Sequence, residues 1–293
     1  MMDNYGFYTG KSFDAYEFFG CHTDENGAVF RVFAPAAVRI SVIGEFNGWQ
    51  DTPMNKIGDG NFWAVYIEGV KPGQMYKYKI YKPDGSCMDH CDPYGYGMEL
   101  RPASASIVRN LYGYEFQDDA WMKKRSNGVA SALNIYEIHA GSWKKPQNGW
   151  YRYDELATQL VPYLKEYGYN YIELLPIGEH PCDESWGYQC SGFYSPTSRY
   201  GTLDDYKKMI DILHHNDIGV IMDFVPVHFA VDAYALAKFD GTALYEYPHK
   251  DVGNSEWGSC NFMHSRGEVR SFLQSCANYW LKEYHVDGLR MDA

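Results

Sequence analysis

The second half of the sequence repeats one pattern, in which a short apolar run is followed by a longer segment with helical spacing. The short runs cover residues 134–139, 171–175, 219–225 and 286–291. The segments between them place apolar side chains three or four positions apart, as one face of a helix does. Strands that alternate with helices form parallel sheets. The pattern therefore predicts parallel β/α units, either in an open doubly wound sheet or in a (β/α)8 barrel.

Two of the intervening segments also carry a signal for the start of a helix. Thr202 and Asp205 have the spacing of a capping box, and so do Ser265 and Glu268. In a capping box these side chains satisfy the free N–H groups of the first helical turn. We therefore expect helices that begin directly after Thr202 and after Ser265.

Polar residues capable of chemistry collect just after each predicted strand, which favours the barrel. They are His139, Glu173 with Glu179, Asp223 with His228, and Arg290 with Asp292. Catalytic groups of (β/α)8 barrels lie at the carboxyl ends of the strands. A barrel takes about 250 residues, whereas residues 133–293 supply about four of its eight units. We therefore predict an incomplete (β/α)8 barrel and expect the chain to be a fragment.

Arg290 and Asp292 stand two positions apart in the last predicted strand, so their side chains share one face. A guanidinium beside a carboxylate favours the ionised carboxylate, which a glycosyl-transferring nucleophile requires. A surface ion pair is the alternative. Asp223 and His228, at the end of the neighbouring strand, favour a catalytic site because all four side chains then converge at one end of the sheet.

Residues 20–117 show a different pattern, with short runs rich in Val, Ile, Phe and Tyr between turn residues. The expected strands cover residues 28–33, 38–43, 61–67 and 74–81. This spacing predicts a small antiparallel β-sandwich of the immunoglobulin-like type. Residues 1–19 form a lead before it. The polar, aperiodic segment 118–132, with a candidate surface crossing at 123–128, is expected to link it to the barrel.

Two aromatic residues are candidates for contact with sugar. Trp49 lies in a turn after a predicted strand, where it could stack on a sugar ring or be buried as a plug under the turn. We favour the plug because tryptophan is highly buried on average, and we keep Trp49 as a candidate substrate-binding residue. For Tyr188, in the loop after the second barrel strand, stacking on sugar and packing within the loop are equally open.

Charge and cysteine content limit the partners and the compartment. A net charge of −12 argues against nucleic acid or an anionic membrane as partner, and no apolar run approaches the roughly 18 residues of a membrane span. The odd number of cysteines and the absence of an apolar leader indicate free thiols in a reducing cytoplasm. Cys87 and Cys91 flank His90 like half a metal site, but no second pair follows at zinc-site spacing, so we expect ordinary thiols and no metal.

Several stretches resemble a known family. Residues 30–35, 44–49 and 92–94 are similar to the sandwich, related to starch-binding modules, that precedes the barrel of glycogen branching enzymes. Residues 223–228 and 288–293 resemble two signature regions of the α-amylase superfamily of glycoside hydrolases. Five further stretches resemble the 1,4-α-glucan branching enzymes within that superfamily, namely residues 135–143, 173–177, 187–189, 195–201 and 239–245.

The resemblance implies a retaining double displacement without a metal or organic cofactor. Asp292 takes the place of the nucleophile and Arg290 holds it ionised, while Asp223, His228 and Tyr188 line the donor-sugar site. The glucan chain passes to a 6-hydroxyl of another α-1,4-glucan, which makes an α-1,6 branch in glycogen biosynthesis. In the family a glutamate after the fifth strand is the general acid/base, and a second aspartate follows the seventh. Because neither is in this sequence, we expect the intact parent to be the enzyme and residues 1–293 alone to be inactive.

Two alternatives remain open. A debranching or trehalose-releasing hydrolase of the same superfamily shares the sandwich, and it would raise the number of reducing ends, whereas branching leaves that number unchanged. A non-catalytic glucan-binding protein built on the sandwich would lose binding when Trp49 is replaced and keep it when Asp292 is replaced.

Overall fold

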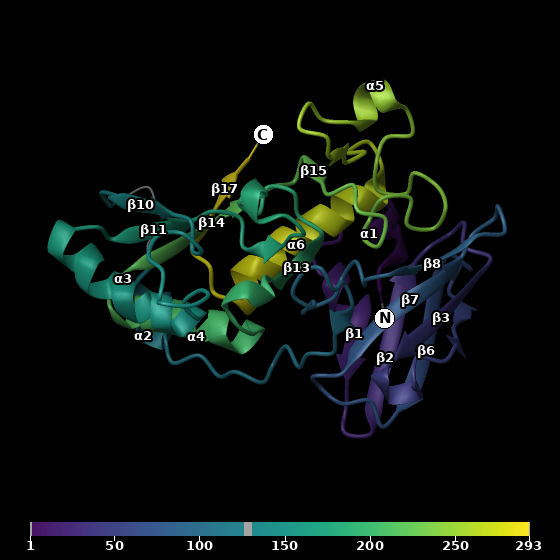
Figure 1. Cartoon of the computed structure of the whole chain (residues 1–293), viewed down its shortest axis with the longest axis horizontal. Helices are drawn as coiled ribbons and strands as arrows, with labels where there is room; N and C mark the ends of the chain where they lie inside the picture. The colour runs from purple at the N-terminus through teal and green to yellow at the C-terminus, as the bar shows by residue number, and fades with distance from the viewer. Residues whose placement is uncertain (1, 126–130, 293) are drawn as a thin grey trace.

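The computed structural model describes residues 2–125 and 131–292, which form a β-sandwich and an α/β part (Figure 1). The sandwich carries the purple and blue strands, and the α/β part carries the teal, green and yellow elements. Helix α6, Gly267–Glu283, runs between the sandwich and the parallel sheet. The predicted fold class, a sandwich followed by the first strands of a (β/α)8 barrel, is confirmed, whereas the domain boundaries after residues 19, 117 and 132 stay predictions.

Both sheets of the sandwich are antiparallel. The first consists of β1 Gly20–Thr23, β2 Gly27–Phe33, β6 Phe62–Glu68 and β5 Asn55–Ile57, in that order. The second consists of β4 Thr52–Pro53, β3 Arg39–Gly44, β7 Met75–Tyr81 and β8 Cys87–His90, with β9 Ser106–Ile107 beside β7. Strands β2, β3, β6 and β7 lie within one residue of the predicted ranges. Side chains such as Phe30, Val42 and Tyr78 are fully buried and belong to the hydrophobic core.

The N-terminal lead joins the sandwich to helix α6. It contains helix α1, Asn4–Thr9, and the 3-10 helix η1, Ala15–Glu17. The Tyr16 hydroxyl donates to Glu283 Oε1 at 2.6 Å, and the Tyr16 N–H donates to Ser275 Oγ at 3.0 Å. Ser271 Oγ donates to the Phe7 carbonyl at 2.8 Å. The lead is therefore bonded to a helix of the barrel part through buried groups.

The barrel part contains one parallel sheet of four strands in sequential order. They are β10 Ile135–Ile138, β11 Tyr171–Leu174, β14 Gly219–Phe224 and β17 Gly288–Met291. Helices α3 Tyr153–Tyr167, α4 Leu203–His215 and α6 connect them. In a doubly wound sheet the strand order reverses at a switch point, and no reversal occurs among these described strands. The sequential order therefore resolves the open alternative in favour of the barrel.

One of the two predicted helix starts is correct. At α4 the Asp205 N–H donates to Thr202 Oγ1 at 3.3 Å, and the Thr202 N–H donates to Asp205 Oδ2 at 2.7 Å, which confirms that capping box. The prediction of a capping box at Ser265 and Glu268 is wrong, because α6 begins at Gly267 without a capping side chain. Gly267 lies against the Tyr8 backbone, so docking of the lead fixes this helix end.

The predicted linker contains a helix that the sequence did not reveal. Helix α2 covers Asp119–Lys124, and its Trp121 is buried. The Trp121 ring stacks on the His214 ring at a centroid distance of 5.1 Å, and its Nε1 donates to Asp287 Oδ1 at 2.8 Å. The segment is thus docked on the barrel part from Asp119 onward. Residues 126–128 of the candidate surface crossing lie outside the described residues.

Loops at the carboxyl ends of the parallel strands carry short elements of their own. The loop after β11 contains the hairpin β12 Gly178–Glu179 and β13 Gly192–Pro196, with 3-10 helices η3 Asp183–Ser185 and η4 Ser198–Tyr200. The loop after β14 contains β15 His228–Phe229, helix α5 Lys250–Gly253 and β16 Cys260–Asn261, with β15 and β16 paired. These two loops bring residues far apart in sequence to the same end of the sheet.

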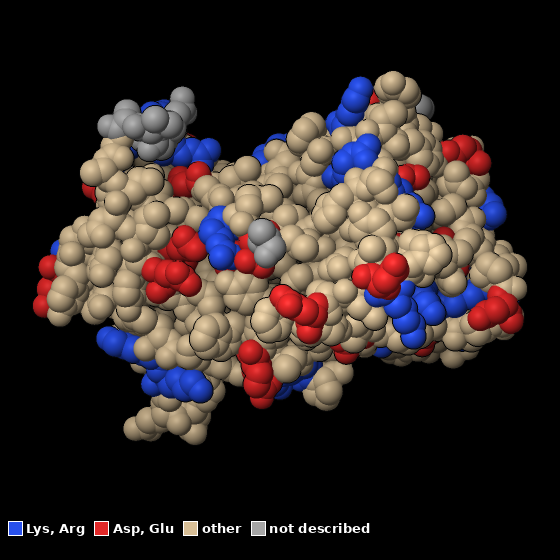
Figure 2. Space-filling view, turned by 90° about the horizontal axis from the view of Figure 1, so that it is seen from above, with Lys and Arg blue, Asp and Glu red and all other residues tan. Residues whose placement is uncertain are grey.

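The surface of the described residues carries charges of both signs. On the face shown in Figure 2, acidic and basic side chains are interspersed over the molecule. None of the helices within residues 2–125 and 131–292 has the length and apolar character needed to cross a membrane.

Candidate active site

The centre of the site lies where β14 and β17 end side by side. Asp223 and Arg290 occupy paired positions of the two parallel strands, and the Asp292 N–H extends the pairing to the Phe224 carbonyl at 2.9 Å. Arg290 Nη1 donates to Asp292 Oδ1 at 2.6 Å and lies 3.1 Å from each carboxylate oxygen of Asp223. One guanidinium nitrogen thus bridges two carboxylates, and the predicted convergence of these three side chains is confirmed.

Tyr188 approaches Asp223 from the loop after β11. Its hydroxyl donates to Asp223 Oδ2 at 2.6 Å. The preceding Gly187 has a φ of +90°, and a Cβ there would lie 2.2 Å from the Pro176 carbonyl oxygen, so glycine is required for this turn. Burial, followed by the hydrogen bond to Asp223, raises the pKa of Tyr188, which keeps the phenol protonated as a donor.

Burial also raises the pKa of Asp223, whereas the hydrogen bonds from Tyr188 and Arg290 lower it. The two opposing effects arise because the carboxylate is almost fully buried yet receives two donors. For Arg290, the hydrogen bonds to Asp223 and Asp292 raise the pKa above its ordinary value. The guanidinium is therefore a permanent positive charge between the two carboxylates.

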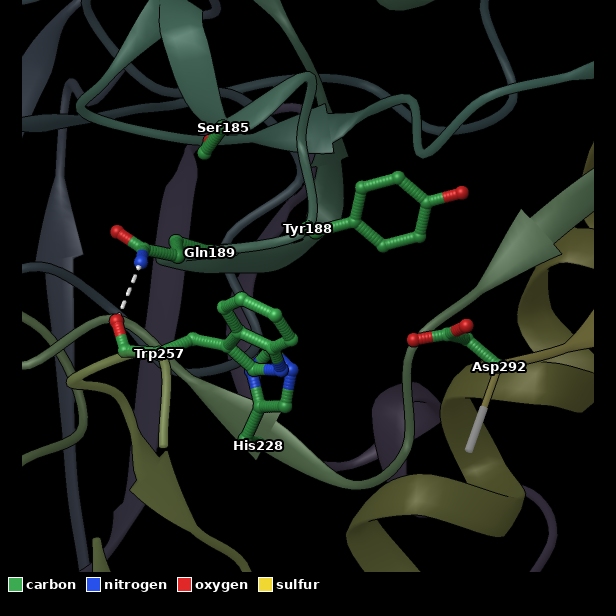
Figure 3. Close-up of a pocket in the computed structure, with 6 residues that line it drawn as sticks. All are labelled: Ser185, Tyr188, Gln189, His228, Trp257 and Asp292. Carbon is green, nitrogen blue, oxygen red and sulfur yellow. Dashed lines mark hydrogen bonds between the residues drawn. The ribbon is translucent and has the colours of Figure 1, made fainter. Parts of the chain in front are cut away.

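A cavity of about 410 Å³ opens beside this charge cluster (Figure 3). It is lined by Ser185, Tyr188, Gln189, His228, Trp257 and Asp292. Gln189 Nε2 donates to the Trp257 carbonyl at 3.2 Å, which ties the loop after β11 to the loop after β14. The Trp257 side chain is 71% exposed, so one aromatic face is open to solvent or to a ligand.

His228 lies at the start of β15 and lines the same cavity. Its side chain is buried, and its Nδ1 has no hydrogen-bond partner among the described residues. Burial lowers the pKa of His228, and the negative charge of Asp292 opposes this effect. A neutral imidazole presents one donor and one acceptor, which suits the hydroxyl groups of a sugar.

The remaining polar residues predicted at this end of the sheet have different surroundings. Glu173 lies near Asp223, and burial followed by the charges of Glu137 and Asp223 raises its pKa. Glu179, the other polar residue noted after β11, does not line the cavity, because its side chain is buried in an ion pair with Arg199 at 2.7 Å. The hairpin of β12 and β13 turns this carboxylate inward, away from the cavity.

His139 lines a second cavity of about 270 Å³ and stacks on Trp186 at a centroid distance of 5.7 Å. Other residues lining this cavity include Ser142, Lys145, Trp150, Asp183, Glu184 and Tyr200. The segment from residue 184 to 188 faces both cavities, since Ser185 and Tyr188 line the first and Glu184 and Trp186 line the second. The two cavities therefore share one wall.

Trp49 belongs to neither cavity. It follows the 3-10 helix η2, Glu45–Asn47, of the sandwich and has a φ of +60°. Its side chain is 42% exposed, so the favoured interpretation of a buried plug is wrong. The conformation of the turn, which the sequence alone did not define, directs the indole outward.

Trp257 is the residue that the sequence did not identify. It lies in an exposed turn far from any predicted strand, and the pairing of β15 with β16 and the hydrogen bond from Gln189 bring it to the cavity. Its setting between Glu256 and Gly258, in a polar turn, is the one signal that an exposed aromatic side chain was present. Among the described residues, no group of three or more His, Cys, Asp or Glu side chains could hold a metal ion.

Two family models and a set of curated proteins match this chain. Residues 18–95 match the model of carbohydrate-binding module 48, the isoamylase N-terminal domain, and residues 156–251 match that of the α-amylase catalytic domain. The fold and the matched domains define the class, which is a carbohydrate-binding module 48 followed by part of an α-amylase catalytic domain. Within that class, curated relatives with 42–47% identity over the whole chain are 1,4-α-glucan branching enzymes named GlgB. The resemblance to branching enzymes is therefore confirmed.

Two relatives and one solved structure illustrate the match. GlgB of Fusobacterium nucleatum subsp. nucleatum is 46% identical, with 100% of this chain and 48% of the relative covered. GlgB of Nitrosospira multiformis is 47% identical, with 99% and 40% covered. The chain thus spans about half the length or less of these relatives. A pullulanase from Paenibacillus barengoltzii, solved with maltohexaose and α-cyclodextrin, has a TM-score of 0.78 at 21% identity over 98% of this chain and 49% of its own, which shows the common fold.

Proposed function

We propose that the protein to which residues 1–293 belong is a 1,4-α-glucan branching enzyme of glycogen biosynthesis. It cleaves an α-1,4-linked glucan and transfers the released chain to a 6-hydroxyl of another glucan, which makes an α-1,6 branch. The observation that carries the proposal is the bridging of Asp223 and Asp292 by Arg290 at the edge of the 410 Å³ cavity. The identity of 42–47% to branching enzymes supports this reaction over the others of the superfamily.

The proposed mechanism is a retaining double displacement that uses side chains alone. Asp292 attacks the anomeric carbon of the donor glucan and forms a covalent glycosyl-enzyme, while the α-1,4 glycosidic bond breaks and its oxygen leaves as a 4-hydroxyl that takes a proton from a general acid/base carboxylate. Arg290 donates to Asp292 at 2.6 Å and so orients the attacking carboxylate. Asp223, Tyr188 and His228 hold the donor sugar. In the second step the acceptor 6-hydroxyl attacks the anomeric carbon and gives its proton to the same general acid/base carboxylate, while the bond to Asp292 breaks and Asp292 leaves as a carboxylate.

A retaining mechanism also needs a general acid/base carboxylate about 5–5.5 Å from the nucleophile. The curated relatives are about twice as long as this chain. We therefore propose that this glutamate, and a second aspartate that stabilises the transition state, lie outside residues 1–293. Residues 1–293 expressed alone are then inactive, while the longer protein is active.

The sandwich is proposed to bind the glucan at a distance from the cavity. The match to carbohydrate-binding module 48 covers it, and the exposed Trp49 offers a flat face for sugar. The α-1,4-glucan partner is glycogen or an amylose-like chain. The seven cysteines are all free, which supports the reducing cytoplasm as the compartment.

The test compares the full-length protein, its Asp292→Asn variant and residues 1–293 on amylose. Branch formation is measured as new α-1,6 linkages, with reducing ends counted in the same samples. We expect new branches at a constant number of reducing ends from the full-length protein and none from the other two. A rise in reducing ends would instead identify a debranching or trehalose-releasing hydrolase, and retention on glycogen without any turnover would identify a non-catalytic glucan-binding protein.

A further inference from the structure

A histidine enclosed by two carboxylates lies at the amino ends of the same two strands that carry the site. His214, in the last turn of α4, is fully buried. Its Nδ1 lies 2.7 Å from Asp118 Oδ2, and its Nε2 lies 2.9 Å from Asp287 Oδ2. Both carboxylates are themselves almost inaccessible to solvent. None of these three residues lines the 410 Å³ cavity or the 270 Å³ cavity.

The geometry determines which protons the ring carries. A neutral imidazole has one N–H and one lone pair, whereas an ionised carboxylate only accepts hydrogen bonds. Both short contacts are therefore hydrogen bonds only when both ring nitrogens of His214 are protonated. Asp118 also accepts from His285 Nδ1 at 2.9 Å, and Asp287 also accepts from Trp121 Nε1 at 2.8 Å. These additional donors favour the ionised form of both carboxylates.

The pKa of Asp287 agrees with this arrangement. Burial acts to raise it, but the hydrogen bond and the charge of His214, together with the Trp121 bond, bring it below its ordinary value. The charges around the cluster also balance. Arg125 Nη1 lies 3.4 Å from Asp287, so two cations face two anions when His214 is an imidazolium. The other charged groups nearby form pairs of their own, Lys124 with Asp217 and His215 with Asp211.

Asp287 connects this cluster to the alignment of the catalytic strands. Its N–H donates to the Val220 carbonyl at 2.8 Å, and its Oδ2 accepts the Val220 N–H at 2.8 Å. The main-chain N–H and carbonyl of Val220 are thus both bonded to Asp287, the residue directly before β17. The register of β14 and β17 continues from Val220 and Asp287 to the pair of Asp223 and Arg290 at the other end of the strands. A shift at Asp287 would move Arg290 relative to Asp223.

We propose that His214 is a positioning residue, held as an imidazolium between Asp118 and Asp287, that locks β17 onto β14 and so aligns Asp223, Arg290 and Asp292. The effect on catalysis rests on the proposed function, whereas the protonation state and the lock do not. His214 acts through the strands and not on the sugar, so its loss lowers kcat for branching more than it changes KM.

The first experiment measures the ring nitrogens of His214 by NMR in the full-length protein labelled with ¹⁵N-histidine. At pH 8, well above the ordinary histidine pKa of about 6.5, we expect one ring with both nitrogens protonated. That signal should be absent from the His214→Gln variant, or, where this variant fails to fold, should change in Asp118→Asn. A single protonated nitrogen on His214 at pH 8 would overturn the proposal whatever the activity of the protein.

The second experiment measures branching kinetics of His214→Gln, Asp287→Asn and the control His215→Gln. His215 is the exposed neighbour of His214 and contacts neither Asp118 nor Asp287. We expect kcat to fall at least tenfold in the first two variants with KM within threefold, and both constants to stay within twofold in the control. Unchanged kcat in folded His214→Gln would exclude a positioning role. An inactive parent protein would refute the proposed function instead, and the NMR signal would still decide the state of His214.

Discussion

Replacing Tyr188 by phenylalanine removes one hydroxyl and keeps the aromatic ring. That hydroxyl donates to Asp223 Oδ2 at 2.6 Å, and the contacts of Arg290 with the same carboxylate remain after the change. Because the pKa of Tyr188 is raised by burial and by this bond, the phenol is a donor throughout the neutral range. The substitution therefore isolates one hydrogen bond to a carboxylate of the site.

The size of the effect follows from the charge of the acceptor. A hydrogen bond to a charged group contributes about 1.5–3 kcal/mol, and about 1.36 kcal/mol corresponds to a tenfold change in rate. We therefore expect kcat/KM for branching to fall by about 10- to 150-fold. The pH profile should change as well. Tyr188 lowers the pKa of Asp223 against the effect of burial, so its loss should move the acid limb of the profile to higher pH.

The assay is kcat/KM on amylose between about pH 5 and pH 8 for the full-length protein and the Tyr188→Phe variant. Tyr114→Phe is the matched control, because the Tyr114 hydroxyl donates to Asp211 Oδ2 at 2.8 Å and burial likewise raises its pKa, but it lies outside the cavity. We expect this control to keep kcat/KM within twofold. A Tyr188→Phe variant with more than half of the parent activity and an unmoved acid limb would refute the reasoning, as would an equal loss in the control.

Three further predictions concern single positions. Burial raises the pKa of Asp92 to about 6, above its unfolded value, so the parent should lose up to about 3 kcal/mol of stability as pH rises from about 4 to about 6, and Asp92→Asn should lack this slope in urea unfolding. Trp49→Ala should weaken retention in a glycogen affinity gel while changing the unfolding free energy by less than about 0.5 kcal/mol, and Asp292→Asn should leave retention unchanged. Gly187→Ala places a methyl group 2.2 Å from a main-chain oxygen, so it should lower kcat/KM at least as much as Tyr188→Phe in the same assay.

The long strands were predictable because their signal is local. Strands β2, β3, β6 and β7 each contain six or seven residues rich in Val, Ile, Phe and Tyr, and in β7 buried and half-buried side chains alternate along the whole strand. Short strands such as β4 and β5 contain two or three residues, too few to define a period. Helix α2 was missed for a different reason. Its six residues are anchored by the bond from Trp121 to Asp287, a contact between distant parts of the sequence.

The same distinction separates the predicted site residues from the missed ones. Asp223 and Arg290 lie near the carboxyl ends of neighbouring strands and Asp292 directly follows β17, so the parallel topology alone brings them together. Glu179 also follows a strand, but the hairpin of β12 and β13 turns it toward Arg199, and no local sequence pattern predicts that turn. Trp257 reaches the cavity through contacts between loop segments, namely the pairing of β15 with β16 and the hydrogen bond from Gln189. Topology therefore predicts the charged centre of the site, whereas its aromatic wall depends on loop conformation.

The two ends of the β14 and β17 pair carry the same charge pattern with opposite consequences. At each end one cation lies between two carboxylates, Arg290 at the carboxyl end and His214 at the amino end. At the amino end the side chains of His214, Asp118 and Asp287 are almost fully buried, and Arg125 supplies a second positive charge, so no net charge remains to attract a ligand. At the carboxyl end Asp292 lines an open cavity and shares its only described cationic partner with Asp223, which leaves one negative charge beside the cavity. Attack on an electron-poor anomeric carbon requires a negatively charged carboxylate that faces the cavity, as Asp292 does. The neutral, buried cluster at the amino end fixes the strands from which this carboxylate projects.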